Sequence, residues 1–137
     1  MTIEEIGNTL PNGFHDSDIL AIHIDYVRGE ASFLMDVDLT SPDEKVDVPS
    51  RHGELKLSGL LYCVIEPPGY SLAKEYVFCE DKLWISADSP DFSELKEPPK
   101  LPEPIPEGGF RHWFFSSSHN CFIYVAAMSA NLNWVDG

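Results

Sequence analysis

The sequence predicts a mainly β fold, in which an antiparallel sheet forms a sandwich or an open barrel and one short helix stands at the N-terminus. Three observations predict this class. Two pairs of segments have the alternation and turn residues of β-hairpins, a long β-prone run lies between them, and clear helix signals are confined to the first residues. The 137 residues fit a single domain, residues 1–137. The alternative class is an α+β sheet with the helix covering one face.

The helix is predicted from its ends. Thr2 and Glu5 have the spacing of a capping box, in which the side chain of each residue accepts a hydrogen bond from the backbone amide of the other. Gly7-Asn8 is a typical helix end. Ile3 and Ile6 stand three residues apart, so they share one face, which we expect to be buried.

Residues 19–26 and 31–39 predict the first hairpin, because apolar residues occupy alternate positions in both segments. Gly29 can adopt the positive φ of a tight turn, so we place the turn at Arg28-Gly29. Every apolar residue of the inner face then lies opposite another. The predicted pairs are Tyr26–Ala31, Ile24–Phe33, Ile22–Met35 and Leu20–Val37.

Residues 40–53 are polar and contain two prolines, so we expect a loop. Residues 54–65 form a long β-prone run that is apolar on both faces in its second half, which indicates a central strand covered from two directions. Glu66-Pro67-Pro68-Gly69 ends this run. Residues 76–79 and 83–87 predict a further hairpin.

Residues 89–109 form an acidic loop that holds six of the eleven prolines, and we expect it to be extended. Residues 110–116 and 121–128 form the last clear hairpin. We expect a final short strand at 132–135, with Trp134 packed inward. The predicted pairs of the hairpin are Phe115–Phe122 and Trp113–Tyr124 on one face, and Phe114–Ile123 and His112–Val125 on the other.

The formal net charge of −14 restricts the kinds of partner. Nucleic acids and anionic membrane surfaces repel such a chain, because both are bound mainly through Lys and Arg. A basic protein partner would be attracted and steered. The alternative is that the acidic surface serves solubility alone.

The cysteine pattern favours a reducing compartment. Cys63 and Cys121 lie in apolar runs, no pair has CxxC spacing, and the total of three is odd. Residues 1–10 carry two glutamates and no basic or long apolar stretch, so we expect no signal peptide. No apolar run reaches the length of a membrane span. We therefore expect a cytoplasmic protein.

His15-Asp16 is the first candidate for chemistry, because this dipeptide can hold a divalent metal ion. The set would be completed by His112 or His119, brought near by folding. The alternative is a polar turn, in which Asp16 or Asp18 accepts hydrogen bonds from backbone amides before the first strand.

A second set comprises His23, Asp25, Asp36 and Asp38, which the predicted register places together on the outer face of the first hairpin. Carboxylates suit Mg²⁺ or Ca²⁺, so this set is a hypothetical cation site. The alternative is an ordinary solvated face of a sheet.

Three further patterns have both a functional and a structural interpretation. Ser116 to Asn120 places serine beside histidine, but such residues also suit a hairpin loop. Residues 99–102 read PxxP, the motif of SH3 ligands, which proline-rich loops also produce by chance. The closing hairpin has aromatic residues that would line a pocket or pack in a core: Trp113, Phe114, Phe115, Phe122 and Tyr124. No Walker A loop, GxGxxG, HExxH or zinc spacing is present, so we expect no cofactor.

Two segments carry a resemblance. Residues 10–16 read LPNGFHD, and the closing segment reads HWFF and then NCFIYVAA before Trp134. Together they resemble a family of small bacterial proteins of unknown function with a GFHDA-like start, although Ser17 stands where that pattern often has alanine. The chain is also loosely similar to the small acidic immunity proteins of polymorphic toxin systems. The resemblance implies a protein-binding role and supplies no catalytic residues.

Two functional hypotheses follow from the sequence. The first is a non-enzymatic interaction module, immunity-like, that binds a basic protein partner. The second is a small metal-dependent hydrolase or ligand-binding domain that uses His15 and Asp16. A lipocalin-like carrier of small molecules is a third, and it requires an apolar cavity.

Overall fold

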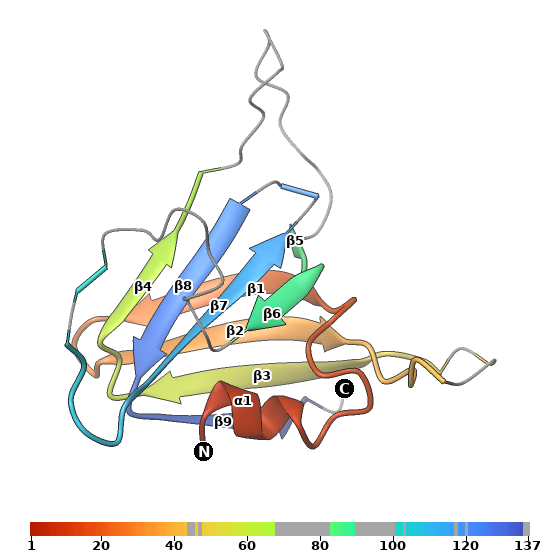
Figure 1. Ribbon diagram of the computed structural model, residues 1–137, viewed down its shortest axis with the longest axis horizontal. Helices are drawn as coiled ribbons and strands as arrows, with labels where there is room; N and C mark the ends of the chain where they lie inside the picture. Colours follow the sequence, from red (N-terminus) through yellow and green to blue (C-terminus); the bar gives the residue numbers. More distant parts are fainter. Residues whose placement is uncertain are drawn as a thin grey trace, which may run out of the picture.

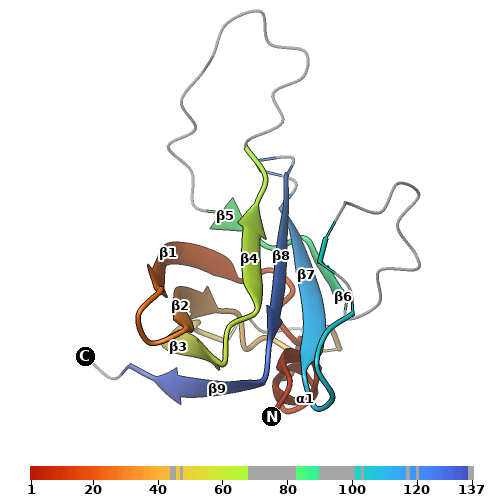
Figure 2. The same cartoon turned by 90° about the vertical axis from the view of Figure 1, so that its left-hand side faces the viewer.

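A computed structural model describes residues 1–43, 46, 48–67, 83–89, 101–102, 104–116, 118–119 and 121–135, with the backbone alone at 87–89. Within these residues the fold is mainly β, with two antiparallel sheets and one short helix, which confirms the predicted class (Figure 1). The strands of one sheet run across those of the other (Figure 2). The predicted strand at 76–79 and most of the proline-rich loop, with its PxxP motif, lie largely outside the described residues.

Helix α1 spans Ile3–Gly7 and has the predicted capping box. The Glu5 amide donates to Thr2 Oγ1 over 3.0 Å, and the Glu5 carboxylate accepts from the Thr2 amide. Asn8 is the C-cap, and Ile3 and Ile6 are both buried. In the described part of the chain, no helix is long and apolar enough to span a membrane.

The first sheet has the strand order β5-β1-β2-β3-β9. Its strands pair antiparallel throughout. In sequence order they are β1 (Asp18–Asp25), β2 (Glu30–Val37), β3 (Arg51–Ser58), β5 (Leu83–Trp84) and β9 (Ser129–Trp134). Residues 83–87, predicted as one strand, are divided, because the chain leaves this sheet after Trp84 and joins the other at Ala87.

The second sheet has the strand order β4-β8-β7-β6. In sequence order its strands are β4 (Tyr62–Ile65), β6 (Ala87–Ser89), β7 (Phe110–Ser116) and β8 (Cys121–Ala127). The register of β7 and β8 is the predicted one, with Phe115 opposite Phe122 and Phe114 opposite Ile123.

The register of the β1–β2 hairpin differs by two residues from the prediction. Its turn has four residues, Tyr26 to Gly29, because the Asp25 carboxylate accepts hydrogen bonds of 3.0 Å from the amides of Val27 and Arg28. A shift of two residues keeps the same faces together, so Ile24 lies opposite Ala31. Tyr26, predicted to face inward, is exposed at the turn.

A bulge near the start of β1 changes the alternation there. As a result Ile19 is buried in the core, whereas Leu20, which the prediction placed inward opposite Val37, is half-buried. The bulge also sets Asp18 directly opposite Asp36 at the end of the hairpin.

The predicted strand at 54–65 is broken in two, because Gly59 has a φ of +62° and turns the chain from the first sheet into the second. The closing segment crosses between the sheets at Met128, beside this turn. The Met128 amide donates to the carbonyls of Ser58 and Gly59, both at 3.1 Å. The two crossings therefore form one corner that joins the sheets.

The core lies between the sheets. Phe114 is 1% exposed and meets Phe14 and Phe33 edge to face, with ring centroids 5.8 and 6.4 Å apart. Trp134 is partly buried and packs against the core cluster, as predicted, and Arg51 stacks on its ring at 4.4 Å. The core thus joins both sheets and the segment after the helix.

Candidate functional site

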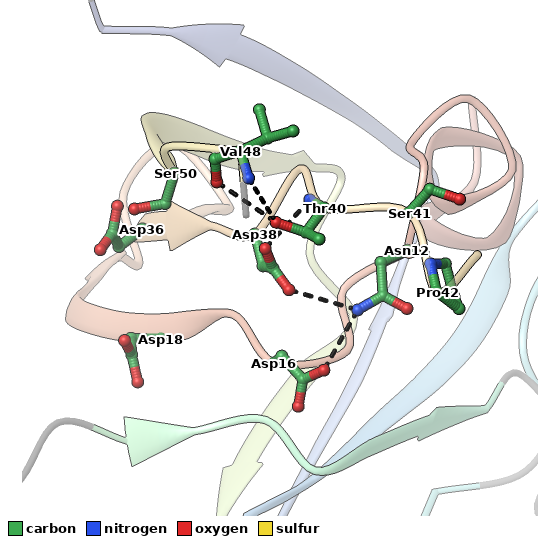
Figure 3. Close-up of a pocket in the computed structure, with 10 residues that line it drawn as sticks. All are labelled: Asn12, Asp16, Asp18, Asp36, Asp38, Thr40, Ser41, Pro42, Val48 and Ser50. Atoms are coloured by element: carbon green, nitrogen blue, oxygen red, sulfur yellow. Dashed lines mark hydrogen bonds between the residues drawn. The ribbon is translucent and has the colours of Figure 1, made fainter. Parts of the chain in front are cut away.

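A recess of about 500 Å³ lies where β1 begins and β2 ends (Figure 3). We call it the acidic recess, because four carboxylates line it. They come from the segment before β1, from β1 itself, and from β2 and the residue after it. The lining residues are Asn12, Asp16, Asp18, Asp36, Asp38, Thr40, Ser41, Pro42, Val48 and Ser50.

Backbone contacts fix the segment that leads into β1. The amide of Asp16 donates to the carbonyl of Ile85 over 2.9 Å, and the amide of Ile85 donates to the carbonyl of Ser17 over 2.8 Å. Ser17 is fully buried, and its Oγ accepts a hydrogen bond of 3.1 Å from the amide of Asp38. The segment before β1 is therefore joined to the end of β2, which sets the width of the acidic recess.

Asn12 joins two of the carboxylates. Its Nδ2 lies 3.2 Å from Asp16 Oδ2 and 3.4 Å from Asp38 Oδ2, and it also donates to the carbonyl of His15 (Figure 3). Asp16 has a φ of +62°, a left-handed conformation that Asp tolerates better than most residues. This supports the interpretation of His15-Asp16 as a polar turn.

The far wall of the acidic recess is built from the loop after β2. Asp38 Oδ1 accepts a hydrogen bond of 3.0 Å from the amide of Thr40. The Thr40 hydroxyl accepts from the amide of Val48 over 2.9 Å and donates to the carbonyl of Val48 over 3.3 Å. These bonds hold the two ends of the loop together, so the wall is pre-formed.

The electrostatics of the acidic recess favour a cation. Asp36 faces His52 across the β2–β3 pair, with 3.7 Å between Oδ1 and Nε2, and none of the described lining residues is Lys or Arg. Among the described residues, no three His, Cys, Asp or Glu side chains are grouped so as to hold a metal ion. The four carboxylates of the lining suit a cation that is bound by charge and hydrogen bonds, for example a Lys or Arg side chain.

His15 and His112 line a second recess of about 480 Å³, which we call the histidine recess. The His15 Nδ1 lies 3.2 Å from the carbonyl oxygen of Ser86. His112 is 1% exposed and its ring packs against Phe114, with centroids 4.8 Å apart. Asn12 lines both recesses, so they lie on either side of the turn that precedes β1.

His119 is not among the residues that line either recess. It follows β7, where its Nδ1 lies 3.0 Å from Ser118 Oγ, which in turn lies 2.9 Å from Ser116 Oγ. Ser118 Oγ also accepts a hydrogen bond of 3.3 Å from the amide of Trp84. These contacts tie β5 to the β7–β8 connection, which is the role of a polar hairpin loop.

The second predicted set is not brought together, because its expected register was wrong. His23 lies opposite Ser32, and Asp25 caps the β1–β2 turn. Asp36 and Asp38 instead join Asp16 and Asp18 in the acidic recess. Sequence reasoning missed the parts played by Asn12, Thr40 and Ser50. The available signal was the spacing of acidic residues at the start of β1 and at the end of β2, and using it required the correct register.

The aromatic residues of the closing hairpin pack against the core and against one another. Phe114 points into the core, whereas its neighbours in β7 and their partners in β8 lie on the other face of the sheet. Phe122 is the centre of this group, with ring centroids 4.8 Å from Phe115 and 5.5 Å from both Trp113 and Tyr124. None of these aromatic residues lines either recess.

Stability is expected to fall at alkaline pH. Burial raises the pKa of the Cys63 thiol from 9.0 to about 11, and burial together with the nearby Glu66 carboxylate raises the pKa of Tyr124 from 10.0 to about 12. At both residues the folded state therefore holds the proton more tightly than the unfolded state does. The Cys63 contribution is therefore complete below pH 9 and is lost as the pH rises to about 11, and Tyr124 extends the loss to about pH 12.

Urea unfolding at a series of pH values measures this effect. The variant Cys63→Ala loses packing contacts, a cost that does not depend on pH, and it also removes the titrating thiol. Its stability should therefore decline less steeply than that of the unmodified chain between pH 9 and 11. Parallel declines of the two proteins over that range would contradict the assignment to Cys63.

Comparisons of the chain with protein-family models, with curated proteins and with solved structures find no match.

Proposed function

We propose that this protein is a non-enzymatic interaction module whose acidic recess receives basic side chains of a protein partner. The observation that carries the proposal is the meeting of Asp16, Asp18, Asp36 and Asp38 around one open recess. The formal net charge of −14 adds a long-range attraction for a basic partner. Nucleic acids and anionic membranes do not fit such a surface.

The geometry favours recognition of Lys or Arg over a catalytic role. The carboxylate oxygens of Asp16 and Asp38 already accept hydrogen bonds from the Asn12 amide, which holds them in place. Such a fixed set of acceptors loses little side-chain entropy when a cation binds. A guanidinium would gain paired hydrogen bonds, and an ammonium would gain a point-charge interaction.

A finer form of the proposal names the class of partner. The resemblance to immunity proteins of polymorphic toxin systems supports a basic toxin domain as the partner. A cytoplasmic location belongs to the same proposal, and it is supported by the free thiols of Cys63 and Cys121. Co-purification with the product of a neighbouring toxin gene would test this form.

Neutralising the acidic recess should weaken the binding of an oligo-arginine peptide. Asp18→Asn with Asp36→Asn removes two charges that lie opposite each other in the hairpin. We expect this double variant to bind at least about tenfold more weakly, which corresponds to about 1.4 kcal/mol. Isothermal titration calorimetry at low salt measures the change, and raised salt should weaken binding by the unmodified chain.

The matched control is Asp43→Asn with Glu107→Gln, which removes the same formal charge at exposed positions outside the lining of the acidic recess. It should keep most of the affinity. Equal losses in the two double variants would show that net charge alone binds the peptide, and the recess would then have no specific role.

One observation favours a second candidate, a ligand-binding domain or small hydrolase that uses His15. Folding places His15 and His112 in the wall of one recess, although Asp16 belongs to the neighbouring acidic recess. Calorimetry with Mg²⁺, Ca²⁺, Mn²⁺ and Zn²⁺ tests the metal-dependent form. Saturable binding that is lost in His15→Ala would favour this candidate over the interaction module.

A further inference from the structure

Met128 lies at the corner where the chain passes between the two sheets. Strands β4 and β7 begin, and β8 ends, at this end of the second sheet (Figure 1). The hydrogen bonds of 3.1 Å from the Met128 amide to the carbonyls of Ser58 and Gly59 fix the backbone from which its side chain projects. The corner therefore determines where the thioether of Met128 lies.

The side chain of Met128 packs against glycines from two other segments of the chain. A Cβ added at Gly59 would lie 2.7 Å from Met128 Cγ, so the first atoms of the side chain lie directly against the backbone of the corner. A Cβ added at Gly109 would lie 3.2 Å from Sδ, and one added at Gly108 would lie 3.8 Å from Cε. The sulfur and the methyl group therefore reach the turn of residues 106–109, which precedes β7.

An oxygen added to the sulfur would disturb this packing. The position beside Sδ at which a Cβ of Gly109 would stand lies only 3.1 Å from the carbonyl oxygen of Pro106 and 3.4 Å from that of Ala127. A sulfoxide oxygen is a hydrogen-bond acceptor, so these two carbonyls cannot satisfy it. An oxygen added on the solvent side still makes the thioether polar, which weakens its packing on the turn.

The three methionines of the chain differ in exposure and in surroundings. Met128 is 39% exposed, Met1 at the start of the chain is 59% exposed, and Met35 is fully buried in the core. Met128 thus combines access for a small oxidant with a place at the junction of the two sheets. Met1 and Met35 are internal references for an exposed and for a protected thioether.

We propose that Met128 is a site of reversible oxidation, at which hydrogen peroxide forms the sulfoxide and loosens the corner between the sheets. A lone pair of the sulfur attacks one oxygen of the peroxide, so that an S–O bond forms and the O–O bond breaks. The second oxygen leaves as water after proton transfer, and two electrons pass from the thioether to the peroxide. Methionine sulfoxide reductases can reverse the modification.

The test is treatment of the folded full chain with hydrogen peroxide, followed by mass spectrometry of its peptides and by urea unfolding. We expect oxidation of Met1 and Met128, and protection of Met35 until the chain is unfolded. The equilibrium constant for folding should decrease at least about fivefold when Met128 is oxidised. Reductases that act on the two sulfoxide epimers should restore the original urea midpoint.

Met128→Leu is the matched control, because leucine has a similar volume and no sulfur. The variant keeps Met1 and all three cysteines, so a loss of stability through any of these residues would appear in it as well. Dithiothreitol, added after the peroxide, reverses disulfides and sulfenic acids but not methionine sulfoxide. We therefore expect the urea midpoint of Met128→Leu to be the same with and without peroxide treatment.

Three results would overturn the proposal: oxidation of Met128 in the folded chain no faster than that of Met35, an unchanged urea midpoint after complete oxidation of Met128, or equal losses of stability in the treated chain and in treated Met128→Leu.

Discussion

Replacing Phe114 with alanine is expected to destabilise the fold by about 3–5 kcal/mol, which is the usual cost of truncating a buried phenylalanine. Phe114 is 1% exposed, and its ring meets Phe14, Phe33 and His112 edge to face. These neighbours come from the segment before β1, from β2 and from β7 itself. The ring therefore joins both sheets, and its loss would leave a cavity that none of the three elements can fill alone.

Urea unfolding and thermal melting measure this loss, and a decrease in melting temperature of roughly 10 °C or more is expected for a chain of this size. Tyr26→Ala is the matched control, because it removes an aromatic ring that is 87% exposed and should change stability by less than about 0.5 kcal/mol. If Phe114→Ala and Tyr26→Ala unfold at similar urea concentrations, the assignment of Phe114 to the core is wrong.

The sequence predicts the fold well where the signal is local. The capping box of Thr2 and Glu5 identifies the helix, and alternation identifies both hairpins. The β7–β8 register could be predicted because aromatic residues lie opposite each other on one face and apolar residues on the other. Each of these signals depends on residues that are close in the chain.

The prediction fails where the contact that determines the register or a strand end cannot be recognised from the alternation of apolar and polar residues. Arg28-Gly29 is a plausible two-residue turn, but the Asp25 carboxylate caps a four-residue turn and shifts the register by two. A shift of two keeps the same faces together, so hydrophobicity alone cannot distinguish the two registers. The break at Gly59 was missed because β-prone residues continue on both sides of it, although a glycine inside a strand pattern often marks a bend.

The candidate site could be predicted only in part. Asp16, Asp36 and Asp38 were recognised as candidates, but in two separate sets. Joining them requires the pairing of Asp18 with Asp36, and that pairing depends on both the longer turn and the bulge near Ile19. Asn12 was missed as a connecting residue, because its contacts with Asp16 and Asp38 span four and 26 residues of the chain.

The second prediction concerns the corner between the sheets, where Gly59→Ala is expected to be strongly destabilising. Gly59 has a φ of +62°, and an added Cβ would lie 2.7 Å from Met128 Cγ and 2.8 Å from Met128 Cβ. The left-handed conformation costs a non-glycine residue about 1–2 kcal/mol. Crowding in a packed region adds about 1–3 kcal/mol, because atoms close to the Met128 backbone cannot swing away. We expect a total loss of about 2–5 kcal/mol.

Gly29 separates the two contributions. It has a φ of +64°, and a Cβ added there would meet no atom within 4 Å, so Gly29→Ala should lose only the conformational part. Combining Gly59→Ala with Met128→Ala should recover part of the crowding cost relative to the sum of the two single variants. Urea unfolding of the four variants and the unmodified chain measures the coupling. If Gly59→Ala costs no more than Gly29→Ala, the corner is not tightly packed, and the joining of the two sheets must depend on the core alone.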